Sequence, residues 1–291
     1  MVYLVTGAKG QLGQAVVALL KQQGKQVCAF SRDQLDIGDY GQLAEVFAEH
    51  QPKIVFNCAA YTQVDRAESE SEIAHRVNAQ GPKYLAQLCT QYDAFLCHFS
   101  TDYVFNGKAF LPYEENAVPS PLGVYGQTKR QGEAAVEISQ ARYAILRTAW
   151  VYGLVGKNFV KTILRLAQER ETLRIVEDQI GTPTWTGDLA EVALALAEGQ
   201  TENGIYHVTN SGVASWYDFA VAICEEATHL GWDLRVKEII SISTAEYPTP
   251  AERPSYSVLS RRKVEEKLGH KMTHWRVALR QMLKALWESE H

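Results

Sequence analysis

The opening stretch "VYLVTGAKGQLGQAVVALL" constrains the fold more than any other part of the sequence. A short apolar run, typical of a buried strand, leads into glycines at positions 7, 10 and 13 and then into a helical pattern. The glycines permit a tight turn, close approach of a phosphate, and close packing of helix on strand, although their spacing is G-x-x-G-x-x-G rather than G-x-G-x-x-G. A helix N-terminus also favours an anion. The stretch therefore predicts a βα unit that binds a dinucleotide. The residues expected to contact it are Gly7, Lys9, Gly10, Gln11, Leu12 and Gly13.

Apolar runs and helical patterns alternate through the first half of the chain. The runs are short and almost continuous in hydrophobicity, as strands buried on both faces of a parallel sheet are. This alternation predicts an α/β fold with a doubly wound parallel sheet of the Rossmann type. The expected strands are 2–6, 27–30, 54–60, 95–100 and 143–148, and the expected helices are 11–23, 40–50, 70–91 and 125–139.

The second half of the chain is less regular. It has expected helices at 158–170, 189–198, 215–230 and 275–288, and expected strands at 172–176 and 205–209. The proline-rich stretch "AEYPTPAERPSYS" indicates an ordered loop. We expect a dinucleotide-binding domain over residues 1–150 and a smaller substrate-binding lobe over 151–291, with segments around 172–190 returning to the first domain.

The composition argues against several classes of protein. The net charge is -5, and no basic patch of the kind that nucleic acid requires is present. The five cysteines are scattered without a Cys-x-x-Cys pair, which favours reduced core residues over a metal-thiolate site. No apolar run is long enough to span a membrane, and no basic segment precedes the first one. We therefore expect a cytoplasmic protein without nucleic-acid or membrane partners.

The residues after the second expected strand indicate which dinucleotide binds. Ser31 and Arg32 stand where an acidic residue would hold the ribose 2′-hydroxyl of NAD. A hydroxyl and a guanidinium suit a 2′-phosphate instead, which favours NADPH over NADH. Asp36 and Ile37 follow, and we expect them at the edge of the adenine.

Tyr125 and Lys129 stand one helical turn apart, just after a Pro/Gly-rich loop, so their side chains project from the same face. An ordinary surface helix explains the spacing as well, but an ammonium beside a phenol also lowers the pKa of the phenol. Thr101 ends the fourth expected strand, at the sheet edge where open α/β sheets bind ligands. The three side chains predict a carbonyl-reducing site. Tyr125 would protonate the developing alkoxide, and Thr101 would hydrogen-bond it.

These features together resemble the extended short-chain dehydrogenases/reductases. The strings "NCAAYTQVDRAE", "STDYVFNG", "YGQTK", "RTAWVYG", "DQIGTPT" and "RPSYSVLS" are similar to those of the dTDP-4-dehydrorhamnose reductase family. With "GQLG" they run in order from Gly10 to Ser260, so the resemblance covers nearly the whole chain. It implies reduction of the C4 ketone of dTDP-4-dehydro-L-rhamnose by NADPH, or by NADH, in the last step of dTDP-L-rhamnose synthesis.

The resemblance also implies roles for individual residues. Thr101, Tyr125 and Lys129 are the implied catalytic residues, and Tyr125 and Lys129 also contact the cofactor. Arg253, in the proline-rich loop, is implied to face the diphosphate, which a guanidinium fork matches. The residues implied on the ribose side of the cofactor are Ala59, Ala60 and Tyr61. Those implied around the sugar are Thr62, Val64, Asp102, Tyr103, Trp150 and Asn158. Among these, Asp102 and Asn158 are also compatible with turns, and Trp150 with the core.

The chain departs from the family at two positions. Some members bind Mg²⁺ through glutamates at a dimer contact, where this chain has Ala15 and, by apparent alignment, Gly187, with Asp188 next to it. Without these carboxylates a hard cation has few ligands. We therefore expect no metal, and either a monomer or a weak homodimer.

Two alternative functions stay open. A sugar-nucleotide epimerase or dehydratase would share the fold, but a dehydratase usually needs an acid/base pair beside the threonine, and no glutamate follows Asp102. A non-catalytic NADP-binding subunit, like the regulatory subunit of methionine adenosyltransferase, also resembles this family. Only an enzyme requires Thr101, Tyr125 and Lys129 together.

Overall fold

The structure is a computed structural model that describes residues 1–290. Six parallel strands form its central sheet, in the order β10-β5-β4-β3-β1-β2. The strand order reverses between β1 and β3, and such a switch point is where doubly wound sheets bind ligands. The Rossmann-type fold is as predicted. The strands are β1 (Val2–Thr6), β2 (Gln26–Phe30), β3 (Ile54–Asn57), β4 (Phe95–Thr101), β5 (Arg142–Thr148) and β10 (Gly204–His207).

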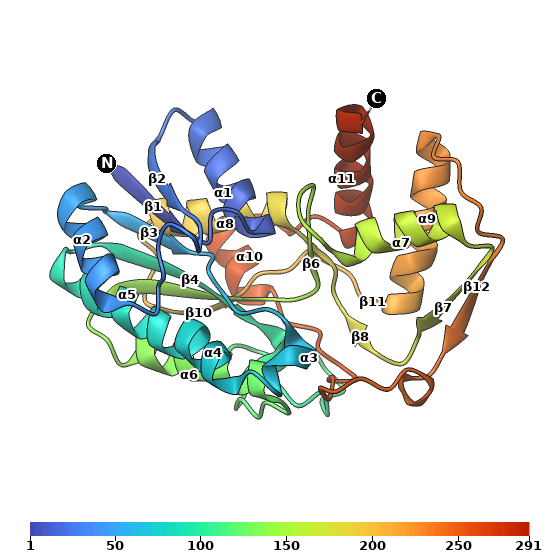
Figure 1. The fold of residues 1–291 in the computed structure, drawn as a ribbon, viewed down its shortest axis with the longest axis horizontal. Coiled ribbons are helices and arrows are strands. Elements are labelled where there is room, and N and C mark those ends of the chain that lie inside the picture. Colours follow the sequence, from blue (N-terminus) through green and yellow to red (C-terminus); the bar gives the residue numbers. More distant parts are fainter. Residues whose placement is uncertain (291) are drawn as a thin grey trace.

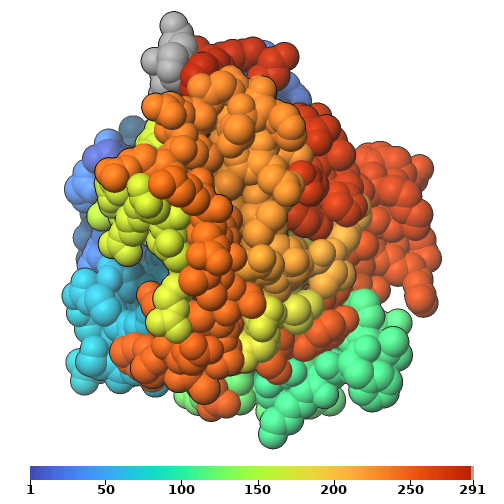
Figure 2. Space-filling view, turned by 90° about the vertical axis from the view of Figure 1, so that its right-hand side faces the viewer, coloured from blue at the N-terminus to red at the C-terminus, as the bar shows by residue number. Residues whose placement is uncertain are grey.

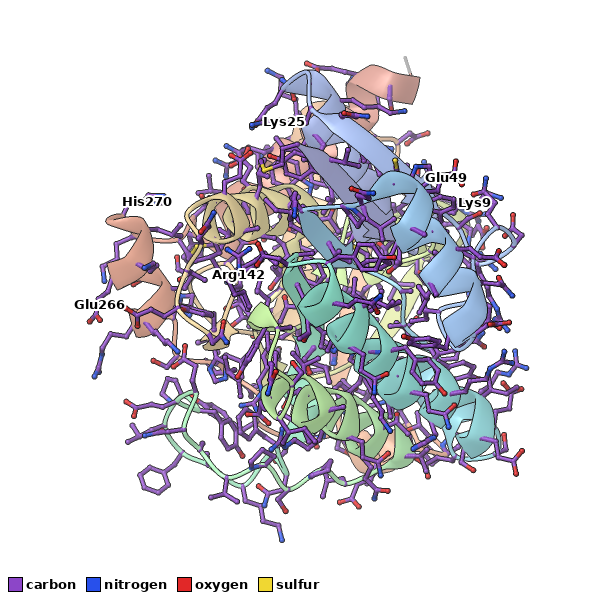
Figure 3. The ribbon with its side chains drawn as sticks, turned by 90° about the vertical axis from the view of Figure 1, so that its left-hand side faces the viewer. Lys9, Lys25, Glu49, Arg142, Glu266 and His270 are labelled. Carbon is purple, nitrogen blue, oxygen red and sulfur yellow. The ribbon has the colours of Figure 1, made fainter. Side chains whose placement is uncertain are left out.

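Helices cover both faces of the central sheet (Figure 1). α1 (Gln11–Gln22) and α8 (Thr186–Glu198) pack together on one face. α2 (Tyr40–His50), α5 (Gly81–Gln91) and α6 (Val124–Glu137) lie side by side on the other (Figure 3). The helix predicted at 70–91 is one rod made of α4 (Ser71–His75), a π-helical turn η1 (Arg76–Gln80) and α5. β3 and β4 are buried along their full length, which explains why their runs are almost continuously apolar.

The loop after β3 begins earlier than predicted. The apolar run 54–60 suggested a strand to residue 60, but β3 ends at Asn57. The chain then leaves the sheet and enters the short helix α3 (Val64–Ala67). Residues 58–60 are apolar because they line a cavity rather than because they pair in the sheet.

The second lobe is built on three helices, α7 (Phe159–Glu169), α9 (Trp216–Leu230) and α11 (Trp275–Glu290). Beside them β7 (Thr172–Val176) pairs in parallel with β12 (Glu238–Ile242), a strand that the sequence did not predict. Figure 2 looks onto the outer face of this lobe, with α9 at its centre. Short elements complete the fold: β6 (Val151–Tyr152) with β9 (Thr184–Trp185), β8 (Ile180–Gly181) with β11 (Ala214–Ser215), η2 (Asp102–Val104), η3 (Thr244–Glu246) and α10 (Arg262–Leu268).

The division of the chain at residue 150 stays a prediction. α8 and β10 follow that position and belong to the layers of the central sheet, whereas β7 pairs outside that sheet. Within residues 1–290, the structure contains no helix long and apolar enough to cross a membrane.

Candidate active site

The glycine-rich loop forms a cradle at the carboxyl end of β1. Gly7 has a φ of 66°, a left-handed conformation that favours glycine. Gly13 is buried, and a Cβ atom there would lie 2.2 Å from the Gly7 carbonyl oxygen. Gly10 is the N-cap of α1, and no side chain caps that helix, so the N–H groups of its first turn are available to an anion. These features fit a pyrophosphate.

A cavity of about 430 Å³ opens beside this loop. Its lining contains most of the residues predicted for the cofactor, and also Thr62, which was predicted at the sugar. Gln11, Leu12 and Gly13, in the first turn of α1, are outside the lining, as are Tyr125 and Lys129 of α6. The predicted residues in the lining are Gly7, Lys9, Gly10, Ser31, Arg32, Asp36, Ile37, Ala59, Ala60 and Tyr61.

Charged groups gather at the end of this cavity formed by β2. Arg32 is exposed there, and Lys9 forms an ion pair with Asp33. The Ser31 hydroxyl donates to Gln34 Oε1 at 2.7 Å. Arg76, which the sequence analysis missed, pairs with Asp36 at 2.7 Å and lines the cavity. An arginine in the middle of a helical pattern gave no signal of this role.

Two of the three predicted catalytic side chains, Thr101 and Tyr125, come together. Thr101 is the last residue of β4, and Tyr125 lies in the first turn of α6. α6 packs closely against η2 because residue 126 is glycine. A Cβ atom there would lie 2.2 Å from the Tyr103 carbonyl oxygen. The side chains of Thr101 and Tyr125 are hydrogen-bonded. The Tyr103 ring meets the Tyr125 ring edge-on, with centroids 5.5 Å apart.

Burial dominates the electrostatics of this group. Lys129 is buried, and its Nζ donates to the Phe99 carbonyl oxygen at 2.7 Å. Burial lowers the pKa of Lys129 to about 8, and Glu133 opposes that shift. Burial also raises the pKa of Tyr125 above its usual value, against the effect of the Thr101 hydrogen bond. The direction for Tyr125 is opposite to that expected from the lysine alone.

Asn78 connects the cofactor loop to the catalytic helix. It is fully buried in the π-helical turn η1. Its Oδ1 accepts from the Tyr61 N–H at 2.9 Å, and its Nδ2 donates to the Tyr61 carbonyl oxygen at 3.0 Å and to Thr128 Oγ1 at 3.2 Å. The sequence analysis missed Asn78. An amide side chain within an apolar helical face was its one available signal.

On the other side of the catalytic group, Arg253 bridges two segments. Its Nη2 lies 2.9 Å from Asp65 Oδ2, and its Nη1 donates to the Tyr103 hydroxyl at 3.1 Å. Arg253 comes from the proline-rich loop and Asp65 from α3, so the contact closes that loop over the first lobe. Val64, also predicted at the sugar, begins α3 and is half-buried.

A second cavity, of about 800 Å³, starts at Arg253 and extends into the second lobe. Arginines and aromatic rings line much of it, and the sequence analysis identified only Arg253 among them. The prominent lining residues are Phe159, Arg170, Arg174, Trp216, Tyr247 and Arg253.

Trp150 and Asn158, both predicted at the sugar, are outside the lining of this cavity and contact elements that form it. The Trp150 ring stacks on Trp216 with centroids 3.5 Å apart, and its backbone has a φ of 48°. Asn158 caps α7 by accepting from the Lys161 N–H at 3.0 Å. Its Nδ2 donates to Gln11 Oε1 at 2.9 Å, which joins the second lobe to the glycine-rich loop.

The positions discussed for a metal lie on the paired helices of the first lobe, with Ala15 in α1 and Gly187 in α8. Across residues 1–290, no group of three or more His, Cys, Asp or Glu side chains is arranged to hold a metal ion. Independence from metal stays a prediction, as does the oligomeric state.

Comparison with known proteins agrees with this geometry. A spore coat polysaccharide biosynthesis protein, SpsK of Bacillus subtilis (strain 168), is 46% identical over 97% of this chain and 96% of its own length. The dTDP-4-dehydrorhamnose reductase of Aggregatibacter actinomycetemcomitans is 41% identical over 95% of this chain and 96% of its own. The crystal structure of dTDP-4-dehydrorhamnose reductase from Bacillus anthracis str. Ames in complex with NADP has a TM-score of 0.91 and 37% identity, covering 97% and 98% of the two chains. The model of the RmlD substrate binding domain matches residues 1–287, and the chain belongs to that family.

Proposed function

We propose that this protein reduces the C4 ketone of dTDP-4-dehydro-L-rhamnose to dTDP-L-rhamnose with NADPH. One observation carries the proposal: Thr101 and Tyr125 are hydrogen-bonded at the carboxyl end of β4, and Lys129 is buried one helical turn beyond Tyr125. The molecule also has a glycine-loop cavity and a cavity rich in arginine and aromatic side chains. The relatives named dTDP-4-dehydrorhamnose reductase, and the NADP complex among them, support both the substrate and the cofactor.

Each catalytic side chain has a distinct task in this reaction. NADPH, when bound, supplies the hydride that C4 receives. Tyr125 gives its phenolic proton to the oxygen of the former ketone, and Thr101 hydrogen-bonds that oxygen and the phenol. The Lys129 ammonium stabilises the phenolate that forms. Burial raises the pKa of Tyr125, so the phenol holds its proton at neutral pH, whereas the Thr101 hydrogen bond opposes this shift and favours release of the proton.

The second cavity fits the nucleotide-diphosphate part of the substrate. Arg170, Arg174 and Arg253 offer guanidinium groups that match phosphate oxygens. Phe159 and Trp216 offer apolar rings, and such rings pack against bases and sugars. We assign Arg253 to the diphosphate because it also contacts Tyr103, whose ring touches that of Tyr125.

The test is the oxidation of NADPH by the purified protein with enzymatically prepared dTDP-4-dehydro-L-rhamnose, followed by near-ultraviolet absorbance in EDTA. We expect rapid turnover with formation of dTDP-L-rhamnose. Restoration of activity only by Mg²⁺ would contradict the expected metal independence alone. NADPH binding without turnover under either condition would favour the non-catalytic subunit, and conversion of the sugar without net oxidation of NADPH would favour an epimerase.

A further inference from the structure

The helix α6, which carries Tyr125 and Lys129, begins without a cap of its own. Its N-cap residue is Gly123, which has no side chain to accept a hydrogen bond from the N–H groups of the first turn. Serine, threonine, aspartate and asparagine are the usual residues at this position. The backbone does not require glycine here, because a φ of -124° is an extended conformation that any residue adopts. Another feature must explain the glycine.

Glu68 supplies the missing acceptor from a distant part of the chain. Its Oε1 accepts a hydrogen bond from the Val124 N–H, the first N–H of α6, at 2.9 Å. A Cβ atom on Gly123 would lie 2.5 Å from the same oxygen. Glycine at the N-cap therefore leaves free the space that the Glu68 carboxylate occupies. The carboxylate also places a negative charge at a helix N-terminus, where the helix dipole favours it.

Apolar packing joins the same two segments. Glu68 directly follows α3, and α3 lies against α6 (Figure 1). Ala67, the last residue of α3, is fully buried in a small apolar cluster, and Val124 and Tyr125 pack against that cluster. The cluster also contains Tyr61 from the cofactor loop. Both the hydrogen bond and the packing therefore hold the start of α6 against the segment that ends in Glu68.

The position of Tyr125 depends on this first turn, because Tyr125 is the second residue of α6. Helix ends fray. The hydrogen-bond partner of Tyr125 is held by η2 instead: Thr101 Oγ1 donates to Asp102 Oδ1 at 3.1 Å and accepts from the Tyr103 N–H at 3.2 Å. A shift of the first turn would therefore move Tyr125 relative to Thr101. A displacement of about 1 Å at a reacting group can cost on the order of a hundredfold in rate.

We propose that Glu68 is a positioning residue, which caps the catalytic helix from outside and so holds Tyr125 in place beside Thr101. The inference rests on the proposed function, in which Tyr125 is the proton donor. Glu68 acts through the backbone of α6 and takes no part in proton transfer. Its role explains why glycine, rather than a residue with a capping side chain, stands at position 123.

Glu68→Ala tests the role, because it removes the acceptor oxygen. We expect kcat to fall about three- to tenfold, the range that corresponds to loss of one helix cap. The dissociation constant of NADPH should change little, because Lys129 lies one turn further along α6, where its Nζ bonds to the Phe99 carbonyl oxygen at 2.7 Å. An unchanged kcat, or a dissociation constant that rises by the same factor as kcat falls, would overturn the proposal.

Glu72→Ala is the matched control for this variant. It removes an exposed glutamate from the neighbouring helix α4 and should leave both kcat and NADPH binding unchanged. A loss of kcat equal to that of Glu68→Ala would show that the effect is not specific to the cap, and would overturn the proposal.

A second substitution, at Gly123, separates a cap from a general structural role. In Glu68→Ala the space beside Gly123 is empty, so Gly123→Ser can add a hydroxyl that caps α6 locally. The double variant should regain most of the lost kcat. Gly123→Ala in the same background fills the space without an acceptor and should restore nothing. Restoration by both substitutions, or by neither, would overturn the proposal.

Hydrogen exchange, measured by mass spectrometry, gives a readout that needs no turnover. Peptides from the start of α6 should exchange faster in Glu68→Ala and recover in the double variant with Gly123→Ser, whereas peptides from the end of α6 should not change. Unchanged exchange and kcat in Glu68→Ala, with normal turnover by the wild type, would overturn the positioning role and leave the proposed function intact. If exchange responds as expected but the wild type does not turn over the dTDP sugar, the proposed function fails, and the positioning role fails with it.

Discussion

The two sides of the candidate active site are built in different ways. The cofactor side is made largely of backbone: the turn at Gly7, the uncapped start of α1 and the loop after β3. The substrate side is made of long side chains from α7, β7, α9 and the proline-rich loop. Backbone sites depend on a few local residues in a fixed order, whereas side-chain sites depend on which distant segments the fold brings together.

Tyr125 lies between the two sides, so its loss should affect chemistry without affecting either binding site. Tyr125→Phe removes the proton donor and keeps the ring that packs on Tyr103. We expect kcat to fall on the order of a hundredfold to ten-thousandfold. The dissociation constant of NADPH, measured by fluorescence quenching, should stay within about twofold. Normal turnover by this variant would remove Tyr125 from the mechanism.

The difference between the two sides explains what the sequence could predict. Gly7, Gly10 and Gly13 lie within one βα unit, and Tyr125 and Lys129 within one helical turn, so their spacing alone places them. In the second cavity, Arg253 is far in the chain from Arg170 and Arg174, and its arrival there follows β12, a strand that was not predicted and that pairs with β7. Asn78 could not be predicted, because its role depends on the packing of η1 against α6, which the sequence does not reveal.

An ion-pair cluster in the second lobe should contribute to stability. Glu226 in α9 is almost buried and bonds to both Arg276 and Arg280 of α11, with contacts of 2.7 to 2.8 Å. These hydrogen bonds lower the pKa of Glu226 from 4.5 to about 2. The stabilisation is therefore present above pH 4.5 and is lost as pH falls through about 2. Glu226→Gln should cost about 2 to 3 kcal/mol at neutral pH, with solvent screening at the arginines keeping it at the lower end.

Denaturation of the wild type and Glu226→Gln at several pH values measures this contribution to the free energy of unfolding. The gap in unfolding free energy should close as the pH is lowered toward 2. The control is Glu169→Gln, which removes an exposed pair with Arg165 at 2.7 Å and should cost less than about 1 kcal/mol. A gap that persists unchanged in acid would mean that Glu226 stabilises the lobe by packing rather than by its charge.

Arg253 tests whether the second cavity holds the diphosphate. Arg253→Ala should raise KM for the dTDP sugar about tenfold or more, as expected for loss of a charge-assisted hydrogen bond, and leave KM for NADPH within about twofold. Arg165→Ala, on the exposed side of α7, is a control that should change neither value. If Arg253→Ala raised both KM values equally, Arg253 would hold the lobes together rather than bind the substrate.

Arg32 gives the smallest expected effect and the sharpest test of the cofactor side. Arg32→Ala should raise KM for NADPH up to about tenfold and leave KM for NADH nearly unchanged, because only NADPH carries the 2′-phosphate. Arg76→Ala is the matched variant, since Arg76 lines the same cavity and pairs with Asp36, where the adenine is expected. It should affect both cofactors alike. Equal effects of Arg32→Ala on both cofactors would mean that this side chain does not set the preference for NADPH over NADH. The cofactor side would then bind through its backbone, in contrast to the side chains of the substrate side.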